Sequence, residues 1–146
     1  MPDETNDSIA EQKGIRTAEV RELARAGIAS ARARDFENGY LVLGEACDRL
    51  RELGEKLPAP VISYYGLCLA LHRGKHREGL DLCQAAIDTE PMKAEYYANL
   101  AEVCAAGRQR RKAVSALQRG LAIDAGNAHL LELQARIGAR RPPVIA

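Results

Sequence analysis

Cys68, His72 and His76 are the residues whose types and spacing come closest to a chemical site. A cysteine beside a histidine can form a thiolate nucleophile, and the three side chains together could ligate a metal. Gly74 lies between the two histidines and is typical of a turn between helices, which would place them on different faces. We therefore interpret Cys68 as a core thiol and expect no metal and no cofactor. A metal- or thiol-dependent enzyme stays as an alternative.

Other catalytic patterns are missing from the chain. It contains no Gly-x-Ser-x-Gly, phosphate-binding loop, His-Glu-x-x-His or dinucleotide fingerprint, and no Cys-x-x-Cys pair. The four cysteines are expected to be unpaired and mostly buried thiols, because free cysteine packs as a small hydrophobe; they are Cys47, Cys68, Cys83 and Cys104. The sequence therefore predicts a protein that is not an enzyme.

Charge and composition exclude several classes of partner. The formal net charge of +1, from 21 basic and 20 acidic residues, gives no overall attraction to nucleic acid or to an anionic membrane. Aromatic residues make up only 4% of the chain, too few for an extensive base-stacking surface. The first twelve residues carry no Lys or Arg, and the apolar stretch 61–71 is too short to cross a bilayer, so a cytoplasmic protein without membrane insertion is expected.

A basic run is the strongest local charge feature, and it consists of Arg108, Arg110, Arg111 and Lys112. It would open a helix, where the helix dipole disfavours cations. The run could contact an anion or an acidic partner, or it could be a solvated turn, and we favour the solvated turn.

The elements that must position these residues are helices. Pro58, Pro60 and Pro91 separate long stretches rich in Ala, Leu, Arg and Glu, and proline inside a helix costs about 3 kcal/mol. No stretch alternates apolar and polar residues as a strand would. The sequence predicts seven helices, at about 17–34, 36–55, 61–73, 77–88, 92–106, 109–123 and 128–138, and hence an all-α fold.

A repeat with a period of 33 to 34 residues organises these helices. Tyr64, Leu67-Cys68 and Leu71 recur as Tyr97, Leu100-Ala101 and Cys104, and Gly79, Cys83 and Ala86 recur as Ala113, Leu117 and Gly120. An earlier, degenerate copy reads Gly39, Leu43 and Ala46, and its extra residues within 51–58 are expected to lengthen its second helix. Gly27, Gly39, Gly79 and Gly120 weaken helices and are therefore predicted where two helices touch closely.

This pattern resembles the tetratricopeptide repeat (TPR) family over about residues 19–140. The resemblance implies a right-handed superhelix of three helix pairs, with repeats at about 20–57, 60–93 and 94–127, and a capping helix at 128–139. It divides the chain into an acidic, mobile N-terminal segment 1–16, a TPR domain 17–141 and an extended tail 142–146. Stacked pairs would share one continuous core.

The resemblance also implies a concave groove, lined by the first helix of each pair, that holds a peptide or helix of a partner. Carried over by position, the groove residues are Arg21 and Ile28; Ile62, Tyr65, Leu69 and His72; and Glu95, Asn99 and Glu102. Tyr65 and Leu69 are the most specific of these, because they stand outside the repeating core pattern. They could instead pack on a neighbouring pair or on the N-terminal segment.

The predicted function is therefore a non-catalytic protein-interaction module with a protein or peptide partner. A narrower alternative is a TPR chaperone of the type III secretion class that holds a translocator subunit, although such chaperones tend to be acidic. The carboxylate clamp of some TPR domains is not implied, because Ala24, Ile28 and Glu95 occupy positions that need basic or amide side chains. A second copy of the chain could cover the degenerate first repeat and the apolar tail.

Overall fold

The computed structural model describes residues 4–138, and within this range helices joined by short turns and loops are the only regular secondary structure. The helices are α1 (Glu4–Arg32), α2 (Phe36–Glu52), α3 (Ala59–Arg73), α4 (His76–Thr89), α5 (Ala94–Ala106), α6 (Arg110–Ile123) and α7 (Ala128–Gly138). The expected all-α fold is confirmed. The predicted tail at 142–146 lies outside the described residues.

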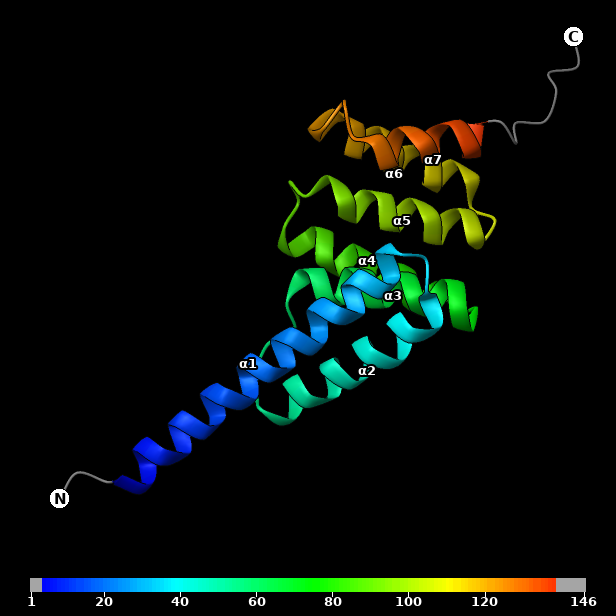
Figure 1. Ribbon diagram of the computed structural model, residues 1–146. Coiled ribbons are helices and arrows are strands. Elements are labelled where there is room, and N and C mark those ends of the chain that lie inside the picture. Colours follow the sequence, from blue (N-terminus) through cyan, green and yellow to red (C-terminus); the bar gives the residue numbers. More distant parts are fainter. Residues whose placement is uncertain (1–3, 139–146) are drawn as a thin grey trace, which may run out of the picture.

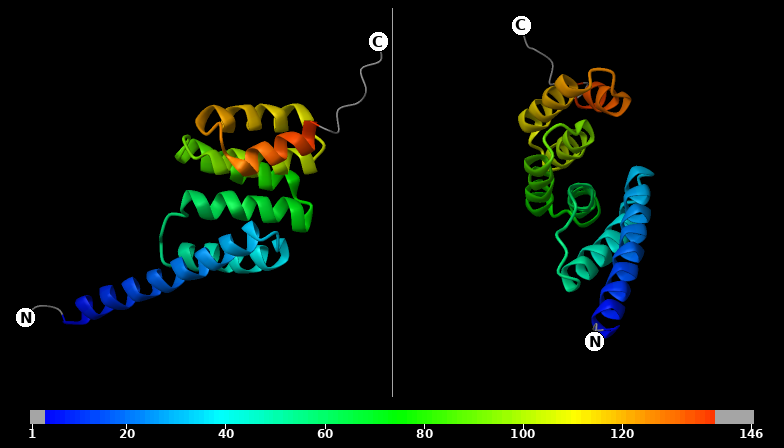
Figure 2. Two further views of the ribbon diagram at one scale, coloured as in Figure 1. Left: turned by 45° about the horizontal axis from the view of Figure 1, so that its top comes forward. Right: turned by 90° about the vertical axis from the view of Figure 1, so that its left-hand side faces the viewer.

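The helices form three antiparallel pairs stacked side by side, α1 with α2, α3 with α4 and α5 with α6 (Figure 1). Within the described range 4–138, the helix α7 is not paired with a following helix, and it packs on α5 and α6. Figure 2 shows that the stack is curved, with α3, α5 and α7 toward its inner side and α4 and α6 toward its outer side. The C-terminal end of α1 passes along the inner side and contacts α3.

One apolar core runs through the whole stack, because each pair buries its face against the next. Its largest fully buried apolar side chains come from α2, α4, α5 and α7; they are Leu43, Ile87, Tyr96, Leu130 and Leu133. All four cysteines are buried and free, as predicted. No pair of helices could bury these side chains alone, so stacking supplies the stability.

Glycines stand where helices touch, as the repeat pattern predicts. A Cβ added at Gly79 of α4 would lie 2.5 Å from the carbonyl oxygen of Gly66 in α3, which is far inside van der Waals contact. Added Cβ atoms at Gly27, Gly39 and Gly120 would come within 2.7 to 2.9 Å of side-chain atoms of neighbouring helices. Close packing between helices therefore requires glycine at these four positions, although glycine weakens a helix.

Two helix ends differ from the prediction. The first helix begins at Glu4 and not near residue 17, and the side chains of residues 6–16 are exposed. Asp7 stands in its first turn, where a carboxylate interacts favourably with the helix dipole. The second helix ends at Glu52, because Gly54 takes a left-handed conformation with φ of 70°, and the extra residues of the first repeat form a loop.

Among residues 4–138, no helix is long and apolar enough to span a bilayer.

Candidate functional site

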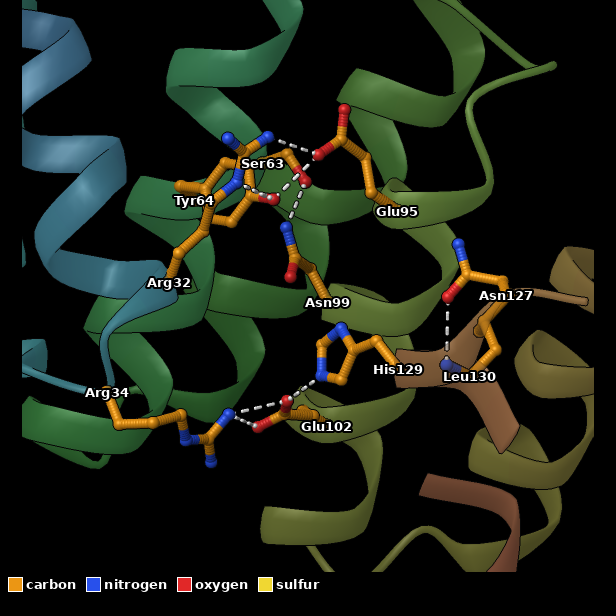
Figure 3. A network of polar contacts seen from close by, with 10 residues as sticks. All are labelled: Arg32, Arg34, Ser63, Tyr64, Glu95, Asn99, Glu102, Asn127, His129 and Leu130. Atoms are coloured by element: carbon orange, nitrogen blue, oxygen red, sulfur yellow. Dashed lines mark hydrogen bonds and ion pairs between the residues drawn. The ribbon is translucent and has the colours of Figure 1, made fainter. Parts of the chain in front are cut away.

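The inner side of the stack has an open hollow of about 610 Å³, which we call the concave hollow. Four elements form its walls: the C-terminal end of α1 with the turn that follows, α3, α5 and α7. Most of the side chains that line it are polar or charged, and the close-up in Figure 3 shows how they reach toward one another across the helices.

Arg32, Tyr64 and Glu95 form the first polar bridge across this hollow. The Arg32 guanidinium donates hydrogen bonds to the Tyr64 hydroxyl at 3.1 Å and to the Glu95 carboxylate at 2.8 Å, and the Tyr64 hydroxyl donates to the same carboxylate oxygen at 2.7 Å. Burial raises the pKa of Tyr64 to about 12, so the phenol stays protonated. Burial by itself would raise the pKa of Glu95, but the hydrogen bonds from Tyr64 and Arg32 outweigh it and the pKa is lowered.

Glu102 is the centre of a second bridge, which ties α5 to both ends of the stack. Arg34 Nη1 donates to both carboxylate oxygens of Glu102, at 2.7 and 2.8 Å, and His129 Nε2 lies 3.0 Å from one of them (Figure 3). The Glu102 side chain is only 4% exposed. Burial would raise its pKa, but the hydrogen bonds from His129 and Arg34 outweigh it and hold the pKa below its ordinary value. The carboxylate is therefore ionised at neutral pH.

A buried hydrogen bond joins α3 and α5 between the two bridges. The Asn99 amide donates to the Ser63 hydroxyl at 2.9 Å, and both residues are essentially inaccessible to solvent. A satisfied polar pair inside an apolar interface fixes the relative position of two helices, because a shift of either helix would leave a buried donor unpaired.

Three of the nine residues predicted for the groove line hollows on the inner side: Glu95, Asn99 and Glu102. All three come from α5: Glu95 and Asn99 line the concave hollow, and Glu102 lines a second hollow. The other six do not line the concave hollow: Arg21 is exposed on α1; Ile28 and Ile62 are half-buried against the core; and Tyr65, Leu69 and His72 lie on α3.

The predicted groove face of α3 contacts α2. Tyr65 stacks on Tyr40 of α2, with ring centroids 6.0 Å apart, and His72 packs on the same tyrosine at 5.5 Å. Leu69 is buried, with 5% of its surface exposed. For Tyr65, the contact with Tyr40 corresponds to the alternative in which it packs on a neighbouring pair.

The sequence did not single out most of the residues that line the hollow, among them Arg32, Arg34, Tyr64 and His129. Tyr64 was assigned to the core by the repeat, and it is both buried and part of the wall. The arginines follow from no periodic pattern, since their partners stand 63 and 68 positions away. For Arg34 the sequence does contain a local signal, because this residue stands at the end of a predicted helix, where glycine is usual.

The geometry gives no sign of a nucleophile or a metal centre at Cys68. Burial raises the pKa of Cys68 to about 12, so almost no thiolate exists at neutral pH. His72 is exposed and lies against Tyr40, on the side of α3 that faces α2. Within residues 4–138, no group of three or more His, Cys, Asp or Glu side chains is placed to hold a metal ion.

Comparisons with known proteins concern the fold. No protein-family model matches the chain, and no curated protein matches it. Among solved structures, the TPR domain of Arabidopsis OM64 superposes with a TM-score of 0.66 at 10% sequence identity, covering 86% of this chain and 99% of that domain. The fold is TPR-like. Because the identity is so low, the likeness extends to the architecture of the TPR-like stack and to nothing about its ligands.

Proposed function

We propose that this chain is a non-catalytic protein-interaction module that holds an extended or helical segment of a partner protein in its concave hollow. The observation that carries the proposal is the hollow itself, which is open, has a volume of about 610 Å³ and is lined by side chains from α1, α3, α5 and α7. Concave sites of this size are typical places for a ligand. The TPR-like fold supports the proposal, because solenoids commonly use their concave surface for binding.

The two bridges support the proposal because they fix the walls before a partner arrives. Arg32 with Glu95, and Arg34 with Glu102, connect the end of α1 to α5 although these helices are not adjacent in the stack. A preformed wall loses less conformational entropy on binding than a mobile one. Charges of both signs face the hollow, which suits a segment with mixed polar side chains.

A photo-cross-linking experiment tests this assignment. A benzoylphenylalanine replaces Glu132, which is exposed and lines the hollow, and in a matched protein it replaces Gln118, which is exposed on α6 away from it. We expect a partner identified by affinity capture to cross-link through position 132 and not through position 118. Cross-linking through 118 alone, or equally through both, would contradict binding in the concave hollow.

A further inference from the structure

A second hollow of about 370 Å³ lies at the edge of the stack where α5 turns into α6 and where α7 ends. Its apolar lining comes from Leu71, Ala105, Ala106, Leu133 and Ile137. Its polar lining consists of Arg34, Arg108, Arg110 and Arg136, with Glu102 as the one acidic side chain among its residues. We call this hollow the arginine pocket. Arg108 and Arg110 belong to the basic run that the sequence analysis left as a solvated turn.

The charges of the arginine pocket are not balanced. Glu102 is already bound by Arg34 and His129. None of the other three arginines is hydrogen-bonded or ion-paired to an acidic side chain within residues 4–138, and the Nε of Arg110 is buried without any hydrogen-bond partner. A guanidinium nitrogen buried without a hydrogen-bond partner is unfavourable, and no acidic side chain of the described residues balances these three cations.

The backbone also shows that two of these arginines stand where stability alone would favour another residue. Arg34 and Arg108 follow the ends of α1 and α5 in the left-handed conformation, with φ of 68° and 61°. The equivalent turn after α3 has Gly74, with φ of 68°. A residue with a side chain is strained in this region relative to glycine. Both strained residues contribute their cations to the same pocket.

The start of α6 adds to the positive potential. This helix begins at Arg110, its N-cap residue Gln109 forms no side-chain cap, and its first turn contains no acidic residue. The free backbone N–H groups and the helix dipole therefore carry partial positive charge beside the arginines. Cations here destabilise the helix unless an anion is bound.

We propose that the arginine pocket binds an acidic segment of the partner protein, with one aliphatic or aromatic side chain on the apolar lining and flanking carboxylates on Arg108, Arg110 and Arg136. The inference rests on the proposed function and specifies the chemistry of the partner. Guanidinium groups pair with carboxylates through two parallel hydrogen bonds, and the apolar lining requires more than a free anion to cover it. Residues 139–146 contain Arg140 and Arg141 and no acidic residue, so their charge does not suit the pocket.

The probe for this proposal is a short fluorescent peptide, blocked at both ends, in which a leucine stands between pairs of glutamates. One control peptide replaces the glutamates by glutamines, and another replaces the leucine by serine. Binding to the full chain is measured by fluorescence anisotropy. We expect the probe to bind, the binding to weaken with added salt, and each control peptide to bind about tenfold more weakly.

Matched variants locate the binding. Arg110→Gln should weaken the probe about tenfold, whereas Arg111→Gln, which removes the same charge one residue further along α6, should change it less than about twofold. Arg108→Gly should weaken binding several-fold while the thermal midpoint stays equal or rises, because glycine relieves the left-handed strain. Loss of both binding and stability would indicate a structural role and contradict the proposal.

Other occupants give different results, and each would overturn the proposal. If inorganic phosphate displaces the probe completely, and the leucine-to-serine peptide binds as tightly as the probe, the pocket is a simple anion site. If the chain self-associates, the self-association prevents the probe from binding, and Arg110→Gln abolishes it, a second copy of the chain occupies the pocket. A chain shortened after Gly138 that binds the probe much more tightly indicates that residues 139–146 occupy it. If the cross-link through position 132 persists in Arg110→Gln and the probe does not bind, this inference fails and the proposed function stands.

Discussion

The Glu102 carboxylate shows how one side chain can connect three distant parts of the stack. It belongs to α5, accepts two hydrogen bonds from Arg34 after α1 and a third from His129 in α7. Since a carboxylate only accepts, Nε2 of His129 must carry the proton of that contact. The cost of burying the charge is offset because all these donors are supplied by the fold.

Glu102→Gln is expected to lower the free energy of unfolding at neutral pH by about 1–3 kcal/mol, because the charge-assisted hydrogen bonds are lost. The pKa of Glu102 is held below its ordinary value, so ionisation stabilises the folded state above the unfolded pKa of about 4.3. This stabilisation is lost as the pH falls through the folded pKa. Urea unfolding at pH 7 and at decreasing pH should therefore show the difference between the two proteins shrinking in acid. A constant difference would contradict this account.

Helix pairs approach one another through glycine contacts, and α3 with α4 is the closest case. Gly66 and Gly79 face each other, and a methyl group on either would meet the carbonyl oxygen of the other at 2.5 to 2.7 Å. Neither atom is the end of a flexible side chain, so the helices themselves would have to separate.

Gly79→Ala should therefore lower the free energy of unfolding by about 1–3 kcal/mol, despite the higher helix propensity of alanine. Gly14→Ala in α1 is the matched control, because nothing lies within 4 Å of its added Cβ. That variant should leave the stability unchanged or raise it by up to about 1 kcal/mol. Thermal and urea unfolding of both variants measure the difference, and equal effects would show that helix propensity and not packing decides.

At the scale of the whole molecule, the last helix closes the stack. Leu130 and Leu133 of α7 are fully buried, and α7 packs on both α5 and α6. The same helix supplies His129 to the concave hollow and Ile137 to the arginine pocket. The cap therefore supports both the stability and the two hollows.

Leu133→Ala is expected to lower the free energy of unfolding by about 2–4 kcal/mol through the cavity that it leaves. Leu131→Ala is the control on the same helix, since Leu131 is 44% exposed, and its effect should stay within about 0.5 kcal/mol. Calorimetry and urea unfolding of both variants test this contrast. Similar losses in both variants would contradict the account in which burial of Leu133 stabilises the stack.

The sequence by itself determined the helices and their stacking. Prolines, turn glycines and a period of 33 to 34 residues are local signals, and they predicted α3 to α7 to within a few residues of their ends and the close contacts of four glycines. The start of α1 was missed, because residues 6–16 are exposed and show no apolar periodicity.

Only the tertiary structure decided which side chains form the hollows. Tyr65 of α3 stacks on Tyr40 of α2 and Leu69 is buried, while the end of α1 brings Arg32 and Arg34 onto residues of α3 and α5. The physical reason is that curvature accumulates from small rotations between successive pairs, which depend on packing across the whole stack. A repeat records the spacing along the chain, and partners 63 or 68 positions apart meet only once that curvature is set.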